Sequence, residues 1–191
     1  MKEKVKIFTI FAIILSMTGC LAGCGSGETA NNPGSRAIKE KINIKDIAWN
    51  VDEGIVGGER YVLLSYTNDT QCTITNFEIT FNEKDGITEE EKSDFYSDIQ
   101  KKFELSDEDM DDLKSKSISM RAETDRVVKP GESISNVNCY YYGGSFYLKD
   151  INHYNLVEPD IATIKYLEED KIFTVYYDYG SKKYSTEEKQ R

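Results

Sequence analysis

The residue best suited to acid–base chemistry is the only histidine of the 191-residue chain, His153. An imidazole titrates near neutrality, so it could exchange a proton with the neighbouring Asp150 or with Glu158. A serine triad would have to use this histidine, but the sequence contains no Gly-x-Ser-x-Gly motif. Lone histidines in loops are usually surface residues. We therefore expect an exposed histidine and no enzyme activity.

Three aspartates, Asp107, Asp109 and Asp111, have the one-three-five spacing of a calcium-binding loop. Position six of such a loop needs glycine and position twelve needs glutamate, but the chain has Asp112 and Ile118 there. The run also coincides with an expected helix start, where acidic side chains are favourable. We interpret these aspartates as solvated helix positions and expect no metal site and no cofactor.

The first 24 residues predict the location of the protein. Three lysines among the first six residues precede an apolar run over residues 7–15, as in a secretory signal that is too short to span a membrane. The segment Leu21-Ala22-Gly23-Cys24 resembles a bacterial lipobox. That resemblance implies a signal peptide over residues 1–23, cleavage before Cys24 and a diacylglycerol on its thiol. We therefore expect a lipid anchor on the extracytoplasmic face of the cell membrane.

Charge limits the partners of the remaining chain. Without residues 1–23, 21 basic and 33 acidic residues remain, a formal net charge of −12. Such a surface repels nucleic acid and anionic lipid headgroups, so we expect neither as a ligand. Residues 24–37 are small and polar, which predicts a flexible tether between the lipid and the folded domain.

Two cysteines lie in the expected domain, Cys72 and Cys139. Thiols of an extracytoplasmic domain often pair, and a disulfide here would close a 67-residue loop, worth about 4 kcal/mol by chain entropy. The alternative is two separately buried thiols. A metal site is disfavoured because the chain has no Cys-x-x-Cys motif and a single histidine.

Most of the chain after the tether has the pattern of β-strands. Phe77, Ile79 and Phe81 alternate with polar residues, and residues 59–66 are rich in strand-forming side chains. Residues 161–167 and 172–179 flank a short charged turn and predict a terminal hairpin. The expected domain covers residues 38–184, and residues 185–191 are expected to form a polar tail.

A helical pair is expected within this β domain, over residues 88–117. Thr88 and Glu91 have the spacing of a capping box. Behind them Phe95, Ile99 and Phe103 recur every four residues and would form one face of a helix. We expect this insertion to supply partner specificity, or to complete the core with its apolar face.

Three short segments suggest a family. Residues 41–46 (KINIKD), 61–68 (YVLLSYTN) and 128–133 (VKPGES) are similar to stretches in a group of uncharacterised lipoprotein domains of Gram-positive bacteria. The resemblance implies a telokin-like, immunoglobulin-type β-sandwich with a role in extracytoplasmic binding and assembly, and it transfers no catalytic residue. The insertion at 88–117 and the tyrosine-rich ending depart from the pattern of that group.

The run Tyr140-Tyr141-Tyr142-Gly143-Gly144-Ser145-Phe146-Tyr147 is a candidate binding surface. On a strand, Tyr141 shares a face with Cys139, whereas Tyr140 and Tyr142 lie on the other face. Exposed rings of Tyr140, Tyr142 and Phe146 could form a platform for sugar rings or a protein partner. The alternative is that these rings complete the core.

The sequence thus predicts a lipid-anchored, non-enzymatic β-sandwich that binds an unidentified envelope protein as an adaptor. A cell-wall glycan-binding module that uses the exposed tyrosines is the alternative. A small-ligand or cation sensor is a third class.

Overall fold

Alternation of apolar and polar residues produces a mainly β fold. In the computed structural model, the described residues are 42–141 and 146–189. Of these, 52% lie in strands and 21% in helices. The predicted signal peptide, Cys24, the tether and Tyr142 lie outside the described residues. No helix in the described part is long and apolar enough to cross a bilayer.

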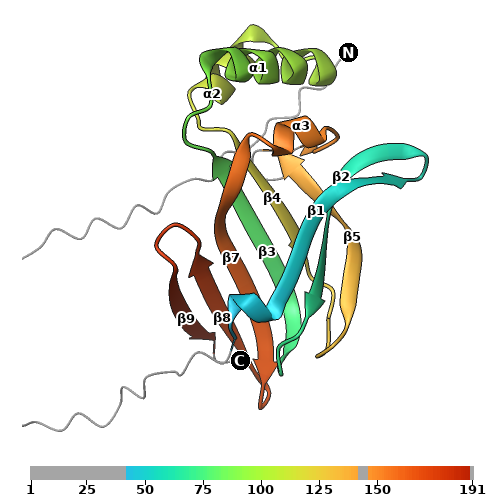
Figure 1. Cartoon of the computed structure of the whole chain (residues 1–191), viewed down its shortest axis with the longest axis vertical. Helices are drawn as coiled ribbons and strands as arrows, with labels where there is room; N and C mark the ends of the chain where they lie inside the picture. Colours follow the sequence, from blue (N-terminus) through green and yellow to red (C-terminus); the bar gives the residue numbers. More distant parts are fainter. Residues whose placement is uncertain (1–41, 142–145, 190–191) are drawn as a thin grey trace, which may run out of the picture. The chain divides into compact units, whose positions relative to one another are not determined.

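Along the chain, two helices are inserted between the third and the fourth strand, as the sequence patterns predict (Figure 1). In chain order they are the 3-10 helix η1 (Ile44–Asp46), β1 (Ile47–Val56), β2 (Glu59–Asn68), β3 (Thr73–Glu83), α1 (Glu89–Phe103), α2 (Asp107–Lys114), β4 (Ser119–Thr124), β5 (Ser133–Tyr141), β6 (Phe146–Tyr147), α3 (Ile151–Tyr154), β7 (Val157–Glu168), β8 (Lys171–Asp178) and β9 (Lys183–Lys189).

All strand pairs are antiparallel, in the order β1-β2-β5-β4-β3-β7-β8-β9, with β6 beside β5. Strand β5 connects two groups of strands: its first part pairs with β2 and its last residues pair with β4. The indole of Trp49 in β1 donates a 2.9 Å hydrogen bond to the hydroxyl oxygen of Tyr179 after β8, which shows that the two ends of the strand order approach each other. The inner faces of both groups therefore enclose one core.

The predicted strands bury the side chains that the alternation assigns to the core. Phe77, Ile79 and Phe81 have no exposed surface. The terminal hairpin is also confirmed: β7 and β8 are joined by Glu169 and Asp170, both with positive φ. The structure differs from the expected polar tail at residues 185–189, because β9 extends through Lys189 and pairs with β8; residues 190 and 191 lie outside the described residues. A polar segment can add to a sheet edge through backbone hydrogen bonds alone, which hydrophobic patterns do not reveal.

The predicted helical pair is confirmed, with α1 and α2 at one end of the strands (Figure 1). Both helices begin with a complete capping box, from Thr88 and Glu91 in α1 and from Ser106 and Asp109 in α2. Because the side chain of Asp109 caps the helix, its run of aspartates forms a helical turn, as expected. The apolar face of α1 lies in the core, with Phe95 and Ile99 each 1% exposed.

Candidate functional site

His153 lies in the four-residue helix α3, whose N-cap is Asp150. The expectation of an exposed histidine is wrong: the residue is only 6% exposed. Its ring packs edge-on against Phe95 of α1, with 4.9 Å between the ring centroids. Helix α1 therefore covers the histidine. The sequence does not indicate this burial, because it depends on how α1 packs.

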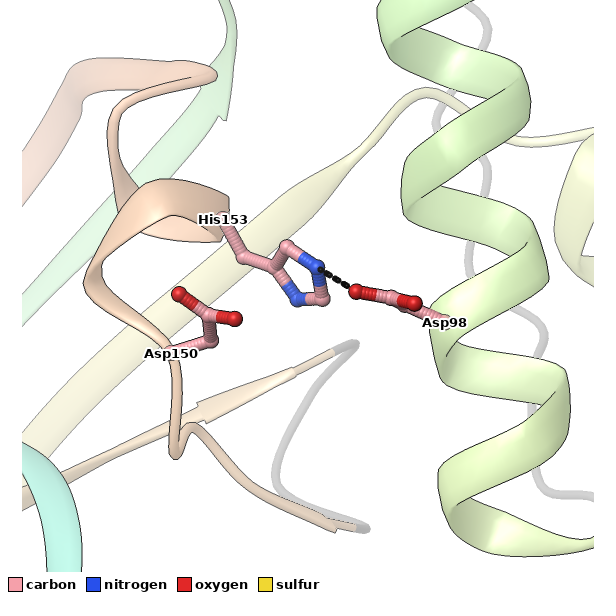
Figure 2. Close-up of side chains that lie close together, drawn as sticks. All are labelled: Asp98, Asp150 and His153. Carbon is pink, nitrogen blue, oxygen red and sulfur yellow. Dashed lines mark ion pairs between the residues drawn. The ribbon is translucent and has the colours of Figure 1, made fainter.

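Both ring nitrogens of His153 face polar groups from other elements, and Figure 2 shows the one that faces Asp98 of α1. The Nδ1 atom lies 2.7 Å from the hydroxyl oxygen of Tyr141 in β5. The Nε2 atom lies 3.6 Å from Oδ2 of Asp98 in α1. Asp150 completes the group, and one ligand-type atom from each of Asp98, Asp150 and His153 lies within 4.8 Å of the other two. We call these three residues the Asp98–Asp150–His153 cluster.

Burial dominates the electrostatics of this cluster. It lowers the pKa of His153, although the negative charges of Asp150 and Asp98 act in the opposite direction and Lys102 adds to the lowering. Burial, together with the charges of Asp150 and Asp98, raises the pKa of the Tyr141 hydroxyl well above its usual range. Burial therefore favours the neutral forms of both the imidazole and the phenol.

A hollow of about 360 Å³ opens beside the cluster, between α1 and α3. Its charged lining consists of Glu91, Asp94 and Asp98 from α1 together with Asp150. These residues supply carboxylates and an imidazole, the types of ligand that bind divalent cations. The lining contains no serine, threonine or cysteine, so the hollow offers none of these nucleophiles.

The sequence identified only part of this cluster. It placed Asp150 beside His153, as the structure does. Glu158, the other predicted neighbour, lies in β7 opposite Asn82 and does not belong to the cluster. Asp98 was missed because it lies 55 residues earlier in the chain. The only available indication was its position next to Ile99, on the edge of the buried face of α1.

The predicted aromatic platform is divided between two faces of the strands. Tyr141 is fully buried, as the alternation predicts, and Tyr140 is half-buried on the opposite face. Phe146 does not accompany Tyr140, because it pairs with Tyr141 and its ring stacks on Phe103 of α1 at 4.3 Å. The pairing of β6 with β5 places Phe146 opposite Tyr141 and Tyr147 opposite Tyr140. The sequence of the tyrosine-rich run does not reveal this register.

A different tyrosine group forms on the outer face. The ring of Tyr140 lies 5.1 Å from that of Tyr147, which in turn lies 5.6 Å from that of Tyr61 in β2. Tyr147 is 45% exposed. Lys149 lies 5.0 Å from the centroid of the Tyr61 ring. We call Tyr61, Tyr140 and Tyr147 the tyrosine surface.

Cys72 and Cys139 are not joined by a disulfide in the structure, in which Cys139 is buried and Cys72 half-buried. The backbone of Cys72 contacts Asn68, at the end of β2 that meets Glu132 before β5. Cys139 lies six residues beyond Ser133 along β5, about 20 Å at 3.3 Å per residue. A disulfide requires a Cα separation below about 7 Å, so the structure has the arrangement of the alternative, two thiols at separate positions.

The outer face of the helical insertion is strongly acidic. Residues 88–117 contain eleven acidic and five basic residues, a formal net charge of −6. Every one of the eleven acidic residues is exposed. The apolar face of α1 packs into the core, whereas its acidic face is exposed to solvent. We call the exposed acidic residues of 88–117 the acidic cap.

The chain matches no family model, no curated protein and no solved structure.

Proposed function

We propose that the protein is a lipid-anchored, non-enzymatic adaptor of the bacterial cell envelope that binds a protein partner through its acidic cap. The anchor is Cys24, by its lipobox-like context. The fold proposed for the domain is a telokin-like, immunoglobulin-type β-sandwich. Support for it comes from β5, which pairs with β2 by its first part and with β4 by its last residues, so that two strand layers face each other.

The acidic cap carries the proposal. A surface with net charge −6 over thirty residues attracts a basic partner at long range and speeds its association. The acidic residues of the cap are not part of the hydrophobic core, to which α1 contributes Phe95, Tyr96 and Ile99. The partner therefore has a positively charged surface, and binding weakens as ionic strength rises.

The test is crosslinking on intact cells that carry either the native protein or a neutralised variant. Glu90→Gln, Glu108→Gln and Asp111→Asn remove three charges from the cap without removing a helix cap. We expect at least a threefold loss of crosslinked partner. Asp52→Asn, Glu158→Gln and Asp170→Asn remove the same charge from exposed positions outside the cap and serve as the control. Equal losses in the two variants would contradict the proposal.

The tyrosine surface favours a second candidate, a cell-wall glycan-binding module. Adjacent aromatic rings on a sheet face can stack on sugar rings. Replacement of Tyr140 and Tyr147 by alanine would then abolish sedimentation with purified cell wall. Tyr176→Ala, at another half-buried tyrosine, is the control. Sedimentation that persists in the double variant would exclude this function, and a fall in melting temperature would show that the rings serve stability.

A further inference from the structure

We propose that the Asp98–Asp150–His153 cluster is a binding site for a divalent transition-metal ion of the zinc class. The site would use Nε2 of His153 and one carboxylate oxygen from each aspartate. It goes beyond the proposed adaptor function, because neither the lipid anchor nor the acidic cap requires it.

The positions of the ligand atoms support a single ion. One ligand-type atom from each of the three residues lies within 4.8 Å of the other two, and Nε2 of His153 lies 3.6 Å from Oδ2 of Asp98. Ligands of one tetrahedral Zn²⁺ lie about 3.4 Å apart when each bond is about 2.1 Å. Closing this difference requires a small movement of one side chain. The side chain of Asp98 is 66% exposed, so it is free to make that movement, whereas His153 is fixed by its surroundings.

The imidazole is oriented as in metal sites. A metal-ligating histidine usually has its other ring nitrogen held by a hydrogen bond, which fixes both the ring plane and the tautomer. Here the Tyr141 hydroxyl lies 2.7 Å from Nδ1. When Nδ1–H donates to that oxygen, the lone pair of Nε2 points toward Asp98 (Figure 2). The 3.6 Å contact between Nε2 and Asp98 exceeds hydrogen-bond length, so Nε2 retains its capacity for a closer ligand.

The ligand chemistry selects the metal class. Magnesium and calcium prefer six or more oxygen ligands, whereas imidazole is a good ligand for zinc, copper, iron and nickel. Two carboxylates neutralise the ion, and three protein ligands leave one coordination position for water or for a group of a partner. The positive charge of Lys102, which acts on His153, disfavours a bound cation. The carboxylates of Glu91 and Asp94, which line the same hollow, counteract that effect.

Bound metal would join two separate parts of the chain. Asp98 belongs to α1 of the helical insertion, whereas Asp150 and His153 belong to the segment that enters β7. The ion would therefore fasten the acidic cap to the sheet domain. Metal binding is expected to raise the thermal stability of the protein.

The experiment uses the full chain, purified in detergent without a histidine tag and stripped with a chelator. Zn²⁺ is titrated by calorimetry, with Mg²⁺ and Ca²⁺ as comparisons. Because the chain has one histidine, a long-range ¹H–¹⁵N spectrum contains one imidazole, and its Nε2 resonance reports coordination directly. We expect one Zn²⁺ per chain, a shift of the Nε2 resonance on binding, and at least tenfold weaker binding to Asp98→Asn.

Asp94→Asn is the matched control. Asp94 lies one turn before Asp98 in α1 and lines the same hollow, and its replacement removes the same charge outside the cluster. Equal weakening by the two variants, or zinc binding without a change at Nε2, would show nonspecific attraction to acidic residues and would overturn the site. Absence of zinc binding would overturn it as well, without affecting the adaptor proposal.

Discussion

At the scale of single residues, Tyr140 and Tyr141 are neighbours in β5 with opposite surroundings. Tyr141 is fully buried, and its hydroxyl oxygen lies 2.7 Å from Nδ1 of His153. Tyr140 lies on the outer face and belongs to the tyrosine surface. The two hydroxyl groups therefore differ in how much stability they contribute.

Tyr141→Phe is expected to lower the free energy of unfolding by about 1–2 kcal/mol, because it leaves Nδ1 of the buried His153 without the hydroxyl. Tyr140→Phe is expected to change it by less than about 0.5 kcal/mol. Urea denaturation followed through the fluorescence of the single tryptophan, Trp49, measures both. Equal stabilities would mean that the Tyr141–His153 contact contributes nothing.

At the scale of elements, Glu83 at the end of β3 holds the helical insertion. Its carboxylate lies 2.6 Å from Nζ of Lys92 in α1 and accepts a 3.2 Å hydrogen bond from the backbone N–H of Ile118, after α2. Partial burial raises the pKa of Glu83, but the hydrogen bonds from Lys92 and Ile118 outweigh it, and the pKa lies below its usual value. The folded state therefore favours the ionised carboxylate.

Glu83→Gln is expected to cost about 1 kcal/mol of stability at pH 7. Because the folded pKa of Glu83 is below the unfolded one, this contribution is complete above about pH 5 and is lost as the pH falls through about 4 and lower. Urea denaturation of the native chain and the variant at several pH values measures the convergence. Asp112→Asn, which breaks an exposed pair with Lys116, is the control and should cost less than about 0.5 kcal/mol. A difference that stays constant with pH would contradict this role of Glu83.

The elements also show how far sequence reasoning reaches. The capping box at Thr88 and the acidic run from Asp107 are local patterns, so they predict the starts of both helices correctly. Strand β9 was missed because its pairing with β8 relies on backbone groups that every residue has. Asp98 was missed as a member of the cluster because its contact with His153 depends on tertiary packing of α1, which no local pattern encodes.

At the scale of the whole molecule, the proposed adaptor consists of a membrane anchor, a tether and a binding domain. Mass spectrometry of the N-terminal peptide of protein extracted from membranes tests the anchor. We expect the chain to begin at Cys24 with a diacylglycerol on its thiol. A Cys24→Ala variant should lack this lipid and leave the membrane fraction. An unmodified Cys24 on the membrane-bound native chain would contradict the anchor.

The most direct test of the adaptor function is crosslinking on intact native cells, followed by identification of the attached molecules and of the residues that carry the crosslinks. We expect one recurrent envelope protein with a basic surface, joined to lysines within residues 88–117. Recovery of wall fragments without a consistent protein, or of a partner joined only outside residues 88–117, would contradict it.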